Sequence, residues 1–145
     1  SYGDWATRGY MAALKADTGE EVWRWYTVPE PGQPGSETWK CDEAGNPDCW
    51  KTGGGAMWVT GSYDPETNTI YWGTGNPVPM FDPEYRPGAN LYTNSSVAID
   101  ADTGKMKRYW GAYGNKLHQL DPGDRRRHGQ AEVVLPVHAR RLHGL

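Results

Sequence analysis

The sequence is short of phenylalanine and of long apolar runs, and both shortages exclude classes of protein. Its apolar runs extend over only a few residues, such as Val133-Val134-Leu135. A transmembrane helix needs roughly 20 apolar residues, so we expect no transmembrane segment. One phenylalanine stands against eight tryptophans and nine tyrosines in the 145 residues. This imbalance favours half-buried aromatic side chains with polar atoms over an apolar helical core.

Targeting signals and standard catalytic motifs are also absent. The chain begins with Ser1 and has no leader-like segment, so we expect either a removed signal or an internal fragment. Gly53-Gly54-Gly55 is not a phosphate loop, Gly73-Thr74-Gly75 lacks the third glycine of a dinucleotide fingerprint, and GxSxG and HExxH do not occur. The basic run at 125–128 is typical of a solvated surface, so we expect no nucleic-acid partner.

Only two cysteines, Cys41 and Cys49, occur in the chain. The residues between them are polar and turn-rich, so a short disulfide is feasible in an oxidising compartment. A zinc site is the weaker interpretation, because no CxxC motif is present and the histidines lie far along the chain. A disulfide and two free thiols stay open as alternatives, and neither implies a functional role.

Glycine and proline are abundant, with 19 and 11 residues, and a turn motif recurs among them. In each copy an apolar strand runs into Thr-Gly or Thr-Asn, and a second strand follows. The copies are 13–23, 62–72 and 98–108. Glycine or asparagine supplies the positive φ of a tight hairpin turn, and we expect the tryptophan four positions later to pack against the neighbouring unit. Three antiparallel hairpins are therefore predicted.

The spacing of these hairpins predicts a repeat architecture. Their threonines are 49 and 36 residues apart, which suits propeller blades of about 40–50 residues built from small antiparallel sheets. Long polar connections, 29–48 and 77–90, separate the hairpins. Loops of this length in a compact β-protein are usually functional or cover a site. We therefore predict an all-β fold, a partial β-propeller.

Charge divides the chain near residue 108. Residues 1–107 carry a net charge of −7, whereas residues 108–145 carry +4, contain all four histidines and hold one of the eight tryptophans. The second part has neither the period of a strand nor that of a helix. We therefore predict an organised segment, 1–107, and an aberrant tail, 108–145, that is disordered or the product of a frame shift.

Several stretches of the organised segment share a family resemblance. They are 4–10 (DWATRGY), 50–58 (WKTGGGAMW), 63–77, 86–91 (RPGANL) and 98–104. These stretches resemble the quinoprotein alcohol dehydrogenases, which include the methanol and ethanol dehydrogenases dependent on pyrroloquinoline quinone (PQQ). The recurring turn resembles the family's tryptophan-docking motif, which girdles an eight-bladed propeller. The resemblance covers residues 1–107 and implies a fragment of about three blades.

The resemblance implies a metal site. Asp4 falls where a carboxylate, most often Glu, binds the active-site metal, and Asn76 falls where an Asn side chain completes the coordination. Oxygen ligands of this kind suit Ca²⁺, or a lanthanide in some members. Asp4 is one methylene shorter than Glu, so we expect the metal to lie closer to this strand or to bind more weakly.

The family resemblance also implies a cofactor site. Trp58 matches the indole that forms the floor under the planar quinone, which requires a large flat ring. Ser1 and Gly3 match positions that line the cofactor, and Ala56 falls where family members often carry a threonine that touches it. That hydrogen bond is therefore expected to be missing. The pattern of residues alone favours plain structural roles for the metal and floor residues, and only the resemblance assigns them to a cofactor.

The implied protein is a periplasmic enzyme that oxidises a small primary alcohol to the aldehyde. In this family the metal polarises the quinone carbonyl, an Asp takes the alcohol proton as hydride passes to the quinone, and electrons leave for a cytochrome c-type acceptor. The alternative is a non-catalytic propeller that serves as a scaffold for protein interactions. A scaffold has no reason to keep a carboxylate, a stacking indole and an amide together.

The resemblance ends where the charge changes. Arg108 stands in place of the docking tryptophan of the last motif, and Gln119 occupies the position of the family's catalytic Asp. Asp121 lies two residues later and is interpreted as a turn residue before Pro122. No catalytic residue is therefore assigned, and the isolated chain is expected to be inactive.

Overall fold

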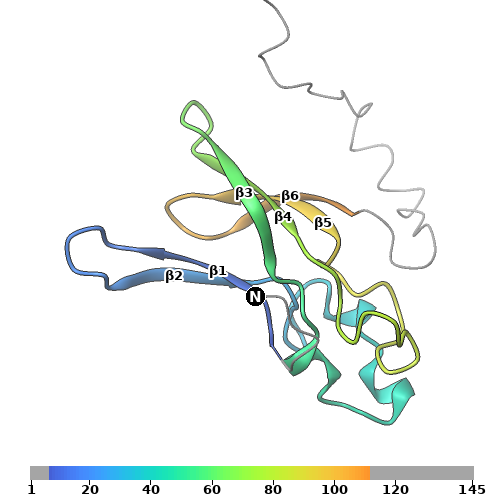
Figure 1. Ribbon diagram of the computed structural model, residues 1–145. Coiled ribbons are helices and arrows are strands. Elements are labelled where there is room, and N and C mark those ends of the chain that lie inside the picture. Colours follow the sequence, from blue (N-terminus) through green and yellow to red (C-terminus); the bar gives the residue numbers. More distant parts are fainter. Residues whose placement is uncertain (1–6, 112–145) are drawn as a thin grey trace, which may run out of the picture.

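The regular structure of the protein is almost entirely β, which confirms the predicted fold class. The structure, a computed structural model, describes residues 7–111 (Figure 1). The strands are β1 (Tyr10–Leu14), β2 (Glu21–Tyr26), β3 (Met57–Asp64), β4 (Thr69–Thr74), β5 (Ser95–Asp100) and β6 (Met106–Gly111). The short 3-10 helices η1 (Ser36–Thr38) and η2 (Cys41–Ala44) lie in the first long connection, and η3 (Cys49–Thr52) follows it directly. No helix in the described part is long and apolar enough to cross a membrane.

The three predicted hairpins form at their predicted positions. β1 and β2 make a two-stranded antiparallel sheet, and β3, β4, β5 and β6 make a four-stranded antiparallel sheet in that order. The second and third hairpins therefore share one sheet, because β4 pairs with β5 across the long connection between them. The three repeats thus amount to two sheets rather than three.

The hairpin turns use the residues that the motif predicts. Gly19, Asn68 and Gly104 have φ of 74°, 49° and 67°, the left-handed region that these residue types tolerate. At the last turn Asp100 accepts hydrogen bonds from the backbone N–H (3.0 Å) and the hydroxyl (2.9 Å) of Thr103. These bonds replace ladder bonds that the chain reversal removes, so the turns are specified locally.

The main core lies between the two sheets. Val97 and Ile99 of β5 are fully buried and meet aromatic side chains from the β1–β2 hairpin. Trp23 of β2 donates its indole N–H to the carbonyl of Ala101 (2.9 Å) in the turn of the last hairpin. A Cβ at Gly104 would lie 2.6 Å from this indole, so glycine is required for the contact. The expected packing of the motif's tryptophan on another hairpin is confirmed for Trp23.

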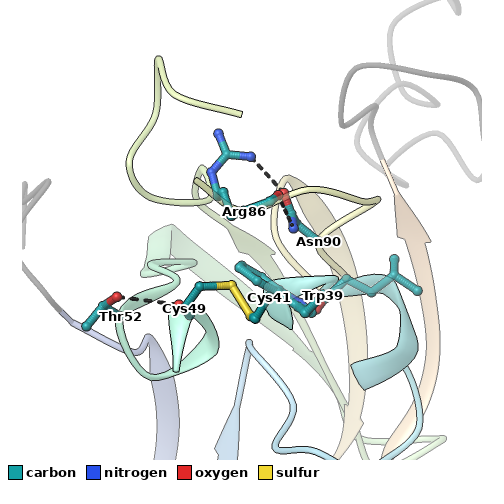
Figure 2. Close-up of a disulfide and its surroundings, with 7 residues drawn as sticks. Trp39, Cys41, Cys49, Thr52, Arg86 and Asn90 are labelled. Atoms are coloured by element: carbon teal, nitrogen blue, oxygen red, sulfur yellow. Dashed lines mark hydrogen bonds between the residues drawn. A yellow bond between two sulfur atoms is a disulfide. The ribbon is translucent and has the colours of Figure 1, made fainter. Parts of the chain in front are cut away.

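A second, smaller core lies under the long connections. Cys41 and Cys49 form a disulfide within it (Figure 2). The disulfide is buried together with Val28 and Trp39, and Trp50 packs against the same cluster. Of the two alternatives that the sequence left open, the disulfide is confirmed.

Backbone bonds fasten the two long connections to each other, and a buried arginine braces the second of them from within. Arg86, 8% exposed, donates to the side chain of Asn90 (2.7 Å) and to the carbonyl of Pro79 (3.0 Å), and Figure 2 shows the first of these bonds near the disulfide. The carbonyl of Pro87 accepts from the backbone N–H of Lys40 (3.0 Å) in the other connection. Burial lowers the pKa of Arg86. This clamp gives the connections a defined shape without regular secondary structure.

The last strand crosses the boundary proposed from the sequence. β6 continues through Arg108 to Gly111, which pairs with Ser95 of β5. Arg108, at the docking position of the third motif, is exposed. The organised segment therefore extends at least four residues past Lys107. The rest of the proposed tail, including Gln119 and Asp121, lies outside the described residues.

Candidate functional site

The structure describes three of the six residues assigned from the resemblance, and it brings them to one place. Ala56, Trp58 and Asn76 lie at the end of the β3–β4 hairpin opposite its turn. Ser1, Gly3 and Asp4 lie outside the described residues, although the chain that follows them at Thr7 is described and reaches the same place.

Backbone hydrogen bonds of the glycine seam, which we define as Gly53–Gly55, hold these segments together. Gly54 donates its N–H to the carbonyl of Thr7 (2.9 Å) and accepts from the N–H of Gly9 (2.7 Å). Gly55 donates to the carbonyl of Asn76 (2.9 Å). The seam therefore lies between the segment that follows Asp4 and the segment that carries Asn76, with each tied to it by short bonds.

Only glycine is compatible with two positions of the glycine seam. Gly54 and Gly55 have φ of 79° and 70°. A Cβ at Gly54 would lie 2.4 Å from Val78 and 2.9 Å from the carbonyl oxygen of Asn76, and a Cβ at Gly55 would lie 2.5 Å from Thr27. The three glycines thus permit a close approach of backbones rather than binding phosphate.

Trp58 presents its indole at this end of the sheet. The residue is 44% exposed, and its cross-strand neighbour is Gly73, which has no side chain to cover it. The register of β3 against β4 shifts between Trp58 and Ser62, and Val59 within this irregularity has φ 57°. A β-branched residue in the left-handed region is strained, and such irregularities reorient the adjacent side chains. The strand is thus distorted directly beside the proposed quinone floor.

Asn76 offers a side chain suited to a hard metal ion. Its carbonyl is engaged by Gly55 (2.9 Å), whereas its exposed side-chain amide has no hydrogen-bond partner among residues 7–111. Ala56 accepts a backbone bond from Gly75 (2.7 Å) and contributes only a methyl group. An amide oxygen is a good ligand for Ca²⁺ or a lanthanide. The residues present therefore fit a metal and a flat ring system.

The described part does not complete a metal site by itself. Among residues 7–111, no three His, Cys, Asp or Glu side chains gather closely enough to hold a metal ion.

Sequence reasoning assigned no role to Arg8, which lies close to the glycine seam. Its backbone pairs with Gly54, and its guanidinium lies over the rings of Tyr26 and Trp50. The only sequence signal was its place within the matched stretch 4–10.

Elsewhere in the core, burial raises the pKa of Tyr92 to about 12, so its hydroxyl stays neutral and donates to the carbonyl of Pro34 (3.1 Å).

Two antiparallel sheets, one of them four-stranded and docked by Trp23 of the other, match the arrangement of a segment of a β-propeller. Residues 2–112 match the family model "PQQ: Glucose/ethanol/alcohol dehydrogenase, beta-propeller domain". The chain belongs to this PQQ-dependent dehydrogenase family. The resemblance, the partial propeller fold and the quinoprotein class predicted from the sequence are confirmed.

Similar proteins include well-defined members of this family. The quinohemoprotein alcohol dehydrogenase of Comamonas testosteroni is 40% identical over 133 residues, which cover 83% of this chain and 17% of that protein. Methanol dehydrogenase [cytochrome c] subunit 1 of Methylorubrum extorquens is 41% identical over 118 residues, 69% of this chain and 18% of that protein. A europium-containing methanol dehydrogenase superimposes with a TM-score of 0.65 at 30% identity, over 77% of this chain and 21% of that one.

These matches bear on the extent of the chain. It spans about a fifth or less of the proteins it matches, as the shares of 17% and 18% show. The match to the Comamonas testosteroni enzyme covers 83% of the 145 residues, which is a longer stretch than residues 1–107. The family resemblance therefore continues past the boundary proposed from charge and composition.

Proposed function

We propose that the chain is a segment of a PQQ-dependent alcohol dehydrogenase that oxidises primary alcohols to aldehydes. One observation carries the proposal: the glycine seam ties the segment following Asp4 to the segment carrying Asn76, beside the exposed indole of Trp58. A carboxylate, an amide oxygen and a flat ring are the three groups that a metal-bound quinone requires from this side.

Each residue has a defined task in this proposal. Bound PQQ supplies the two-electron acceptor that no side chain provides. Trp58 supports the ring system from one face, and Asn76 and Asp4 hold a Ca²⁺ or lanthanide ion through oxygen atoms. Ser1 and Gly3 line the same site. Gln119 occupies the position of the family's catalytic Asp, so no residue of this chain is assigned as the base that takes the alcohol proton.

The proposed substrate, electron acceptor and location are based on similarity to the relatives. By similarity to methanol dehydrogenase [cytochrome c] subunit 1 of Methylorubrum extorquens, a small alcohol is the proposed substrate and a cytochrome c-type protein the proposed electron acceptor. A periplasmic location is proposed on the same basis. A frame shift in the tail, 108–145, stays a hypothesis, and re-reading the encoding DNA across codon 108 and beyond tests it.

The proposed function is tested by the reduction of an artificial electron-accepting dye with a primary alcohol, using the full-length protein loaded with PQQ and Ca²⁺. We expect reduction that depends on both additions. Trp58→Leu is expected to abolish most of it, whereas Tyr63→Leu, an exposed aromatic farther along β3, is the matched control and is expected to retain it. Absence of PQQ-dependent reduction in the unmodified protein would favour the non-catalytic scaffold.

A further inference from the structure

Arg86 is a buried cation that holds the second long connection from within. It begins the matched stretch 86–91, to which the proposed function gives no task. Nε donates to the carbonyl of Pro79 (3.0 Å), and Nη2 donates to the carbonyl of Met80 (3.1 Å). Nη1 donates to the side chain of Asn90 (2.7 Å), a bond that Figure 2 shows near the disulfide. One planar group therefore joins the segment at 79–80 to the end of the connection.

The segment that Arg86 binds is the continuation of the segment that carries Asn76. The carbonyl of Asn76 accepts from the N–H of Gly55 (2.9 Å), and the N–H of Val78 donates to another carbonyl of the glycine seam (3.0 Å). The next two carbonyls along the chain are those that the guanidinium holds. Residues 76–80 are therefore fixed by the glycine seam at their start and by Arg86 at their end.

Charge attraction does not explain these bonds. The three acceptors are two backbone carbonyls and an amide, all uncharged, and Arg86 forms no ion pair within residues 7–111. Burial of a charge without a counter-charge costs free energy, and it lowers the pKa of Arg86. What arginine supplies here is a rigid planar fork whose donors fit three acceptors at once. The fork therefore specifies where residues 79–80 lie.

We propose that Arg86 is a positioning residue for the side-chain amide of Asn76, the oxygen ligand assigned to the metal site. By holding the two carbonyls that end the segment 76–80, it keeps this segment against the glycine seam and limits the positions that the amide can take. Arg86 thus acts through the backbone and not on the metal itself. The inference rests on the proposed function, because Arg86 has this task only if Asn76 binds a metal.

A matched control lies in the other long connection. Thr38 donates its hydroxyl to the carbonyl of Gly35 (2.7 Å), and the same hydroxyl accepts from the N–H of Leu91 (2.9 Å). Thr38→Val keeps the shape of the side chain and removes both bonds, but it removes none of the bonds that hold the segment 76–80. It therefore weakens the fastening of the two connections without releasing Asn76.

The test is a calorimetric titration of Ca²⁺ into the PQQ-loaded full-length protein, comparing Arg86→Lys with Thr38→Val. Lysine keeps the charge but loses the fork. Replacing a residue that orients a metal ligand typically weakens metal binding about 10- to 100-fold, and we expect about 10-fold for Arg86→Lys because it acts through the backbone. Thr38→Val should bind Ca²⁺ as the unmodified protein does. Equal Ca²⁺ affinity in the two variants would overturn the inference.

A second measurement separates positioning of the metal ligand from general damage to the site. In the absence of Ca²⁺, the affinity for PQQ depends on Trp58, which neither variant replaces. We therefore expect this affinity to be the same in Arg86→Lys, in Thr38→Val and in the unmodified protein. A loss of Ca²⁺-independent PQQ affinity in Arg86→Lys would show that the whole site is disrupted, and it would overturn the inference.

A milder variant keeps the test decisive if Arg86→Lys does not fold. Asn90 has φ 55°, which glycine adopts without strain. Asn90→Gly removes the side-chain anchor of the guanidinium and keeps the backbone bond from residue 90 to the carbonyl of Thr38. We expect it to weaken Ca²⁺ binding in the same direction as Arg86→Lys by a smaller factor, and unchanged affinity would overturn the inference.

Failure of this inference is distinguishable from failure of the proposed function. If the unmodified protein binds neither PQQ nor Ca²⁺, the proposed function itself fails. If it binds both, and the variants at Arg86 and Asn90 bind Ca²⁺ as tightly as Thr38→Val does, only the role of Arg86 fails.

Discussion

Replacement of Gly54 by alanine tests whether the glycine seam sets the site. Gly54 has φ 79°, so any other residue pays about 1–2 kcal/mol for the left-handed conformation. Its Cβ would lie 2.4 Å from Val78 and 2.9 Å from the carbonyl oxygen of Asn76. Overpacking of this kind costs typically about 1–3 kcal/mol. Gly54→Ala should therefore lower the free energy of unfolding by about 2–5 kcal/mol, and the strain should displace the backbone of Asn76.

Gly19 supplies the control for this prediction. It has nearly the same φ, 74°, and a Cβ there meets nothing within 4 Å. Gly19→Ala should therefore show only the conformational cost, about 1–2 kcal/mol, with unchanged Ca²⁺ affinity. Thermal melting and Ca²⁺ titration of both variants in the full-length protein separate the two contributions. Equal melting temperatures and equal Ca²⁺ affinities for the two variants would refute the role given to the seam.

Two further predictions concern the hairpins. Trp23→Phe and Trp72→Phe both reduce the ring and leave space in the core. Trp23→Phe also removes the indole bond to Ala101, whereas the indole N–H of Trp72 is buried with no partner among residues 7–111. Trp23→Phe should therefore be the more destabilising by about 1 kcal/mol; urea midpoints of the two variants check this, and equal losses would contradict it. Hydrogen bonds from Thr103 hold the pKa of Asp100 in the folded protein below its ordinary value of 3.8. The stabilisation from the ionised carboxylate is therefore fully present above pH 3.8 and is lost as the pH falls through the lower pKa of the folded state. Asp100→Asn should therefore flatten the acid limb of a stability-against-pH curve, and an unchanged limb would show that the turn does not contribute.

The hairpins could be predicted because their signals are local. A Thr-Gly or Thr-Asn pair fixes the turn within a few residues, and Trp23 docks through a motif that recurs. The sharing of one sheet by β3–β4 and β5–β6 could not be predicted, because it depends on the pairing of β4 with β5 across the connection at 75–94. Nothing in the local pattern of either hairpin encodes that partner.

The candidate site was predictable only in part, and for a related physical reason. Trp58 and Asn76 were found through the family resemblance, but the bonds that bring their segments together pass through Gly53–Gly55, which the sequence analysis matched to the family without assigning them a role. Glycines that permit close backbone contact leave no chemical signature of their own. Arg8 was missed because its partners lie 20 and 22 residues away in the chain.

The most direct test of the central claim is to measure the affinity of the full-length protein for PQQ with and without Ca²⁺. The absorption spectrum of bound PQQ reports the binding. The claim is that Asn76 and Trp58 belong to one metal-dependent quinone site. We predict that Ca²⁺ tightens PQQ binding in the unmodified protein and has no such effect in Asn76→Ala. PQQ binding that is absent, or that responds to Ca²⁺ equally in both proteins, would contradict the claim.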